Sequence, residues 1–202
     1  MKVYSGLNVY EESLQRIRWI FSEFDDVIVG FSGGKDSTLV FNLTLQVARE
    51  LGRLPLKVVW IDQECEWQAT VDYTKSIMEM PEVKPCWMQV PYSFTNSSNL
   101  TDDWFTCWDE TKKDVWVRDK DPMAIWDIGA GDVKFMKAIF PKCYSYCADG
   151  KRYAAIGGVR TDESFSRYLG MTADLTYKDV TWGKKNDNQG GYLFYPVYDW
   201  VS

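Results

Sequence analysis

The sequence contains no histidine, and this absence excludes several kinds of active site. Histidine is the usual acid–base side chain near neutral pH. A Ser-His-Asp triad, a Cys-His pair and a His-ligated zinc site are therefore all excluded. Any chemistry has to use Lys, Arg, Asp, Glu, Cys, Tyr or a bound cofactor.

The sequence has fewer basic than acidic residues: 23 Lys and Arg and 29 Asp and Glu give a net charge of −6. Proteins that hold nucleic acid through phosphate charge tend to be basic, so only a local basic strip would support that function. No apolar run is long enough for a membrane span or for the core of a signal peptide. The five cysteines are an odd number, which indicates reduced thiols. We expect a cytoplasmic protein without membrane contact.

The length of 202 residues predicts a single domain, residues 1–202. Aromatic residues reach 16%, which suits either an aromatic core or flat pockets for ring-shaped ligands. Residues 92–130 are polar, aromatic and irregular, and we expect an insertion there with short helical turns. Alternation of strands and helices elsewhere predicts a parallel α/β sheet. The expected helices are 11–24, 37–51, 67–79 and 131–141, and the expected strands are 26–31, 56–61, 86–91 and 152–158.

Residues 32–37, Ser-Gly-Gly-Lys-Asp-Ser, lie between a predicted buried strand and a predicted helix. Backbone N–H groups at a helix N-terminus form an anion site, and glycines let a ligand approach closely. Lys35 adds a positive charge, and two serines add hydroxyl donors. These features suit a polyphosphate. The alternative interpretation is a simple glycine-rich turn with a helix cap at Asp36 or Ser37.

This segment is not a Walker A loop, because Val29 stands where a glycine is needed and Asp36 follows the lysine. It resembles the pyrophosphate loop of the N-type ATP pyrophosphatase superfamily. The resemblance implies a three-layer α/β/α sandwich that holds the β- and γ-phosphates of ATP with Mg²⁺ and cleaves ATP between the α- and β-phosphates. The implied ATP-binding residues are Phe31, Ser32, Gly33, Gly34, Lys35, Asp36, Ser37, Asp62 and Gly158.

A second motif, "GVRTDESFSRY" at 158–168, resembles a segment of phosphoadenosine phosphosulfate (PAPS) reductase-like proteins. Arginine binds phosphate or sulfate oxygens in a bidentate way. Arg160 and Arg167 are seven residues apart and would share one face of a helix. A surface helix with Glu–Arg ion pairs is the alternative. The implied residues for a second anion, the acceptor, are Arg160, Glu163, Ser164 and Arg167.

Within this resemblance Lys35, Asp36 and Arg160 are the expected catalytic residues. Lys35 would stabilise the departing pyrophosphate, and Asp36 is the candidate magnesium ligand. Asp62, which ends the strand 56–61, would lie beside adenine and ribose, or would simply cap a helix. "FYPVYDW" at 194–200 also resembles this family, and the insertion resembles a subgroup of co-activators of prophage gene expression.

The sequence departs from true PAPS reductases because it lacks their late cysteine segment after "YDW" and keeps an intact loop suited to ATP. Either the chain is a minimal member of this family, or a partner protein or a missing segment completes the site. A homodimer is a separate expectation. Cys143 and Cys147 would share a helix face, where they could carry sulfur, hold a metal with Cys86 or Cys107, or pack in the core.

Three functions compete at this point. The first is an enzyme that transfers adenylyl groups, with release of pyrophosphate, in sulfur-related chemistry. The second is a nucleotide-binding regulatory subunit that acts with a partner protein. The third is an enzyme that thiolates tRNA or DNA, which the acidic balance of the chain disfavours.

Overall fold

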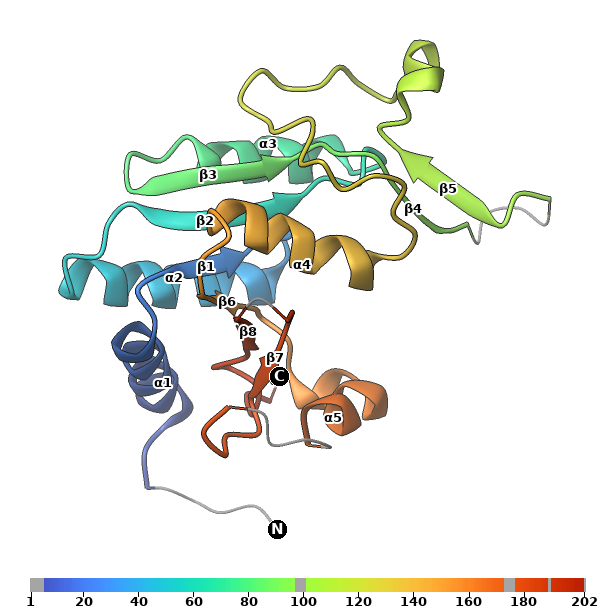
Figure 1. Cartoon of the computed structure of the whole chain (residues 1–202). Helices are drawn as coiled ribbons and strands as arrows, with labels where there is room; N and C mark the ends of the chain where they lie inside the picture. Colours follow the sequence, from blue (N-terminus) through green and yellow to red (C-terminus); the bar gives the residue numbers. More distant parts are fainter. Residues whose placement is uncertain (1–5, 97–100, 173–176, 189, 202) are drawn as a thin grey trace.

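A six-stranded, mainly parallel sheet forms the centre of the protein in the computed structural model, which describes residues 6–96, 101–172, 177–188 and 190–201. The strand order is β3-β2-β1-β6-β8-β7, and only β7 runs antiparallel to its neighbour (Figure 1). The strands are β1 (Val27–Gly30), β2 (Leu56–Ile61), β3 (Val83–Met88), β6 (Tyr153–Ile156), β7 (Gly183–Lys185) and β8 (Gly191–Phe194).

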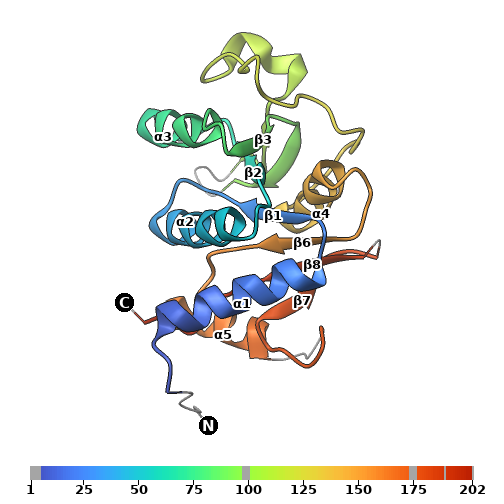
Figure 2. The same cartoon turned by 90° about the vertical axis from the view of Figure 1, so that its left-hand side faces the viewer.

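Helices cover both faces of this sheet, as Figure 2 shows, so the predicted three-layer α/β/α sandwich is confirmed. Side chains alternate along β1: Val27 and Val29 pack with the layer that contains α1 and α2, whereas Ile28 packs with the layer that contains α4. The α-helices are α1 (Val9–Glu23), α2 (Lys35–Glu50), α3 (Gln68–Met78), α4 (Met136–Cys147) and α5 (Phe165–Thr172).

Helices α1 and α2 each begin two residues before the predicted starts at 11 and 37. Asn8 caps α1, because its side chain accepts a hydrogen bond from the Glu11 N–H at 2.9 Å. In α2, Val40, Phe41 and Leu43 begin a buried stripe that faces the sheet. No helix of the described residues is long and apolar enough to cross a membrane.

Two predicted elements have different bounds in the structure. The third strand is Val83–Met88 rather than 86–91, and it includes Pro85. A proline is tolerated there because β3 is an edge strand of the sheet. The helix expected at 131–141 is Met136–Cys147 and continues past Pro141. Its buried residues Ile139, Cys143, Tyr144 and Cys147 pack against the sheet, and this packing outweighs the helix-breaking tendency of proline.

The insertion is more regular than the sequence predicts. It contains an antiparallel hairpin, β4 (Tyr92–Thr95) and β5 (Trp104–Cys107). The expected short helical turn is present as the 3-10 helix η1 (Glu110–Val115). The hairpin projects beyond the carboxyl ends of β1, β2 and β3 (Figure 1).

The sheet has a topological switch point between β1 and β6. From β1 the chain builds outward through β2 and β3, and from β6 it builds outward in the other direction through β8. Open α/β sheets bind ligands outside the carboxyl ends of their strands at such a point. Residues 31–34 follow β1 and residues 157–160 follow β6, so both sequence motifs meet at this place.

Candidate functional site

The loop after β1 has the conformation that an anion site needs. Gly33 has a φ of +72°, in the left-handed region that favours glycine. A Cβ on Gly33 would also lie 2.8 Å from Cγ2 of Thr70 in α3. Gly34 is the N-cap of α2, and no side chain among the described residues caps this helix. The first turn of α2 therefore presents its N–H groups and its positive dipole end to a ligand.

Two serines brace this loop from within. The Ser37 hydroxyl donates to the carbonyl of Gly34 at 2.9 Å and lies 3.1 Å from the Ser32 hydroxyl, which donates to it. The Ser32 N–H also points to the Ser37 oxygen, at 3.3 Å. Ser37 is buried, whereas Ser32 and Lys35 are exposed. The interpretation as a simple side-chain cap at Asp36 or Ser37 does not match this geometry.

The loop after β6 packs directly on the first turn of α2. A Cβ on Gly158 would lie 2.6 Å from the carbonyl oxygen of Asp36, so only glycine fits there. Beyond it, Nε of Arg160 lies 3.2 Å from the carboxylate of Asp36, and its NH1 lies 3.3 Å from Asp162. The Arg160 side chain is 8% exposed. The two motifs thus form one structural unit.

The predicted shared helix face of Arg160 and Arg167 is wrong. Arg160 precedes the 3-10 helix η2 (Thr161–Glu163), and Arg167 lies in α5 after an extended residue, Ser164. Glu163 connects the two arginines instead: it accepts from the N–H of Arg160 at 3.2 Å and forms an ion pair with Arg167. The Ser164 hydroxyl accepts from the N–H of Arg167 at 3.2 Å.

Residues 194–200 hold this second loop in place. The Gly157 N–H donates to the Phe194 carbonyl at 2.9 Å, and the Thr161 N–H donates to the Tyr198 carbonyl at 2.8 Å. Tyr195 covers Gly157, and burial raises the pKa of its phenol to about 12 although the nearby Arg167 favours the phenolate. The "FYPVYDW" segment therefore supports the Arg160 loop through its backbone carbonyls.

Asp62 directly follows β2, as expected, and its side chain is buried beneath the insertion. Its side chain has no exposed surface, and its carboxylate accepts from Nε1 of Trp87 and Nε2 of Gln89, each at 2.9 Å. Arg118 of the insertion donates to it as well. Asp62 thus anchors the insertion to the end of β2, and a direct contact with adenine or ribose would require Arg118 to leave.

Four of the five cysteines are buried, and Cys65 is exposed. Cys86, Cys143 and Cys147 are buried between the sheet and α4, and burial raises the pKa of Cys143 to about 12. A hydrogen bond between Cys86 and Cys147 lowers the pKa of the former thiol and raises that of the latter. The described residues contain no group of three or more His, Cys, Asp or Glu that could hold a metal. Packing is the role that this geometry supports for Cys143 and Cys147, and Cys65 is the exposed thiol.

Sequence reasoning missed the residues by which α3 lines the loop. The methyl group of Thr70 restricts Gly33, the Tyr73 hydroxyl lies 3.1 Å from that of Thr38, and the Tyr73 ring lies 5.9 Å from Phe31. Polar residues on a predicted helix carry no signal of this kind.

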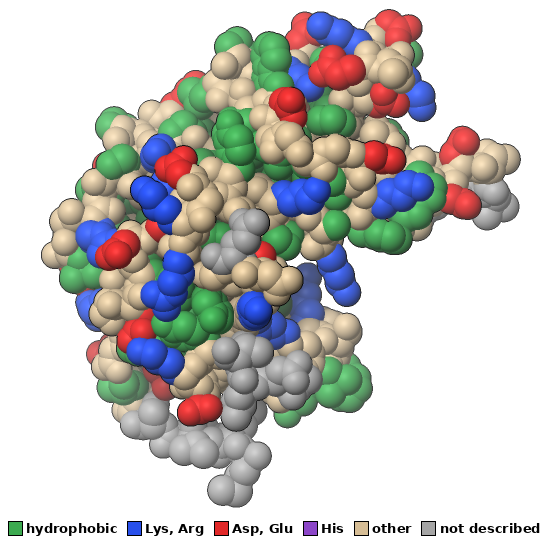
Figure 3. Space-filling view, viewed as in Figure 1, with side chains coloured by type: hydrophobic (Ala, Val, Ile, Leu, Met, Phe, Trp, Pro, Cys, Tyr) green, Lys and Arg blue, Asp and Glu red, His purple; other side chains and the backbone are tan. Residues whose placement is uncertain are grey.

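Figure 3 shows that the molecule is hollowed beyond the strand ends, between the hairpin and α5, and that Lys and Arg side chains gather there.

The sequence and the fold are similar to those of known proteins. A family profile described as phosphoadenosine phosphosulfate reductase domain matches residues 26–202. The Escherichia coli (strain K12) uncharacterized protein YbdN is 29% identical over 98% of this chain, which spans about half (51%) of that relative.

Among solved structures, Candida glabrata FMN adenylyltransferase is similar in fold. Its complex with ATP has a TM-score of 0.51 at 11% identity, over 99% of this chain and 55% of that one. Its complex with FMN and the ATP analogue AMPCPP has a TM-score of 0.51 at 13% identity, over 99% and 57%. At this level of identity the similarity concerns the fold.

Proposed function

The chain belongs to the phosphoadenosine phosphosulfate reductase domain family, and from this membership we propose that it binds ATP and transfers its adenylyl group to an anionic acceptor, with release of pyrophosphate. The main observation in support of the proposal is the start of α2, which no described side chain caps. Gly33 and Gly34 precede this helix, and its first residue, Lys35, is exposed. This is a site for the β- and γ-phosphates, because a polyphosphate would satisfy the free N–H groups and neutralise the lysine. The similar fold of FMN adenylyltransferase, solved in complex with ATP, supports nucleotide binding.

Each residue of the site has a distinct task in this reaction. Lys35 lies at the helix start, where it would stabilise the charge that develops on the departing pyrophosphate. An oxygen of the acceptor attacks the α-phosphorus. The bond from that phosphorus to the α–β bridging oxygen breaks, and the bridging oxygen leaves with the electron pair as part of pyrophosphate.

Asp36 has a positioning task rather than a metal-binding one in this proposal. One of its oxygens faces Arg160 at 3.2 Å, so its charge is already paired. No cluster of acidic ligands surrounds it among the described residues. Magnesium would therefore enter with ATP, held chiefly by the phosphates, as is common for this ion.

Arg167 and Arg160 would meet the second anion, the acceptor. Arg167 is about half exposed, with a side-chain exposure of 48%, and so can contact a ligand directly. Arg160 is buried, and it would act through Asp36 and Asp162. Sulfur, where it takes part, would arrive on the acceptor, because the buried Cys143 and Cys147 give no route for a thiol relay.

The proposal predicts that ATP binding depends on Lys35. Calorimetry should show that the wild-type protein binds Mg·ATP. The affinity of Lys35→Ala for Mg·ATP should be lower by about tenfold or more, because a charge-assisted contact is lost. Lys151→Ala is the matched control, because Lys151 is also exposed but precedes β6 at the amino end of the sheet. Equal affinities of wild type and Lys35→Ala would refute the proposed site. Binding without any turnover would favour the regulatory subunit instead.

A further inference from the structure

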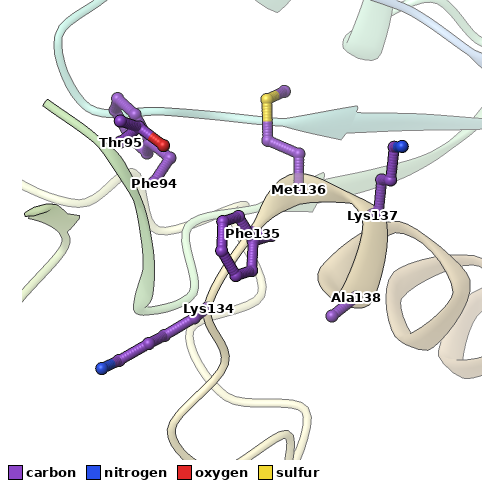
Figure 4. A pocket seen from close by; sticks show the side chains of 7 residues that line it. All are labelled: Phe94, Thr95, Lys134, Phe135, Met136, Lys137 and Ala138. Atoms are coloured by element: carbon purple, nitrogen blue, oxygen red, sulfur yellow. The ribbon is translucent and has the colours of Figure 1, made fainter. Parts of the chain in front are cut away.

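An open pocket of about 660 Å³ lies where the hairpin meets the start of α4. It is lined by Phe94 and Thr95 of β4 and by residues 134–138, and Figure 4 shows the Phe135 ring between Lys134 and the first turn of the helix. The volume is that of a small-molecule site. None of the residues of the two sequence motifs lines it.

At this pocket a residue with a strained backbone, Phe135, exposes its apolar ring to solvent. Phe135 has a φ of +72°, which is an outlier for a bulky side chain, and the residue is 54% exposed. Its N–H donates to the Ser93 carbonyl at 2.8 Å, and its ring meets that of Trp104 edge-on at 4.9 Å. A strained residue that keeps an aromatic ring in water indicates a ligand that covers the ring.

Positively charged side chains at the pocket indicate that the ligand also carries an anionic group. Lys134 and Lys137 are exposed, and neither has a carboxylate partner within 4.0 Å among the residues that the structure describes. Lys134 lies over the Trp104 ring at 5.3 Å. In the part of the chain that the structure describes, no side chain caps α4, so its first turn adds positive potential. The ligand class that fits is therefore a planar ring that carries an anionic group.

The position of the pocket links it to the phosphate loop. Tyr144 of α4 lies against Gly30, the last residue of β1. At 1.5 Å per residue, α4 extends from there by roughly 12 Å to Met136, beyond the carboxyl ends of the strands. The start of α4 and the loop at 31–34 thus lie on the same edge of the sheet (Figure 1).

We propose that this pocket binds the acceptor, and that the acceptor is a free aromatic or heteroaromatic anion of small size. As an acceptor site the pocket rests on the proposed adenylyl transfer, but as a binding site it stands on its own geometry. The Phe135 and Phe94 rings would contact the planar part, and Lys134 and Lys137, together with Arg167, would bind the anionic group. The net charge of −6 disfavours a polyanionic strand as the occupant.

Calorimetry with 1-naphthyl phosphate, in the absence of ATP, tests the pocket. We expect the probe to bind, with an affinity about tenfold lower for Lys134→Ala and for Lys137→Ala and unchanged for Lys151→Ala. Inorganic phosphate and 1-naphthol, which supply the charge or the ring alone, should bind far more weakly. Equal affinities across the lysine variants, or phosphate binding as tightly as the probe, would overturn the proposal. So would much tighter binding of a ten-residue oligothymidylate.

Phe135→Gly separates binding from folding. Glycine accepts a positive φ, so the urea midpoint should stay the same or rise, while affinity for the probe falls. Unchanged affinity for the probe in this variant would contradict the pocket. Lys35→Ala should bind the probe normally. A wild-type protein that fails to bind ATP but binds the probe would refute the proposed function and leave the pocket intact.

Discussion

The carboxylate of Asp36 and Nε of Arg160 lie 3.2 Å apart, and this contact joins the loop after β1 to the loop after β6. Arg160 is almost fully buried, with a second carboxylate, Asp162, on its other side. The two motifs that stand far apart in the sequence therefore behave as one unit.

Removal of Arg160 should destabilise the protein, because the carboxylate of Asp36 loses its buried partner. For Arg160→Ala we expect a free energy of unfolding lower by about 1–3 kcal/mol, measured by urea denaturation. A double-mutant cycle with Asp36→Asn should give a coupling energy of about 1 kcal/mol. If the losses in unfolding free energy of the two single variants simply add up in the double variant, Arg160 and Asp36 do not stabilise each other, and the prediction is wrong.

Gly158→Ala should impair nucleotide binding through the backbone of α2. The added Cβ would lie 2.6 Å from the Asp36 carbonyl oxygen, so the first turn of the helix must shift. Gly170→Ala in α5 is the matched control, since its Cβ meets nothing closer than Lys184 at 3.6 Å and alanine favours a helix by about 1 kcal/mol. Similar ATP affinities in the two variants, measured by calorimetry, would argue against this close approach.

Inorganic pyrophosphate should bind without any nucleoside. It carries the anionic groups that the loop at 32–37 would hold, and Lys35→Ala should weaken its binding by about tenfold. AMP lacks these groups and should compete with it poorly. Competition calorimetry measures both effects, and strong competition by AMP would place the loop at the α-phosphate instead.

Asp62→Ala should be among the most destabilising single substitutions. It leaves the buried donors of Trp87 and Gln89 without an acceptor and removes the ion pair with Arg118. We expect a loss of about 3–5 kcal/mol in unfolding free energy and faster proteolysis within residues 109–127. Asp119→Ala, at an exposed position of the same segment, should change stability by less than roughly 0.5 kcal/mol. A small effect of Asp62→Ala would contradict its anchoring role.

Thiol reactivity should separate Cys65 from the four buried cysteines. Burial, and next the Glu64 carboxylate, raise the pKa of the Cys65 thiol, so less thiolate is present at neutral pH than in free cysteine. Its alkylation rate should therefore keep rising above pH ~8.5, where a free thiol is half ionised. Mass spectrometry should find one modified cysteine in the folded protein and five after unfolding. A plateau below pH ~8.5 would contradict the raised pKa.

The sequence predicts the parts of the fold that depend on local pattern. The apolar run before Gly30, the helical stripe of α2 and the glycine pair at 33–34 each specify their own structure within a few residues. Pro85 and Pro141 obscured two further elements, because an edge strand and a well-packed helix both tolerate a proline that the local pattern disfavours.

Long-range packing is what the sequence does not disclose. The residues next to Asp62 in the sequence give no sign that Arg118, in the insertion, forms an ion pair with its carboxylate. The seven-residue spacing of Arg160 and Arg167 likewise predicts one helix, but a break at Ser164 separates them. The pocket at Phe135 depends on the β4–β5 hairpin, whose pairing the irregular sequence does not reveal.

The fate of the γ-phosphate tests the central claim most directly. Wild-type protein and Lys35→Ala would be incubated with γ-labelled ATP, Mg²⁺ and 1-naphthyl phosphate as the acceptor, and the labelled products separated by thin-layer chromatography. We predict labelled pyrophosphate from the wild-type protein and none from Lys35→Ala. Labelled orthophosphate in its place, or pyrophosphate formed equally by both proteins, would contradict cleavage between the α- and β-phosphates at this loop.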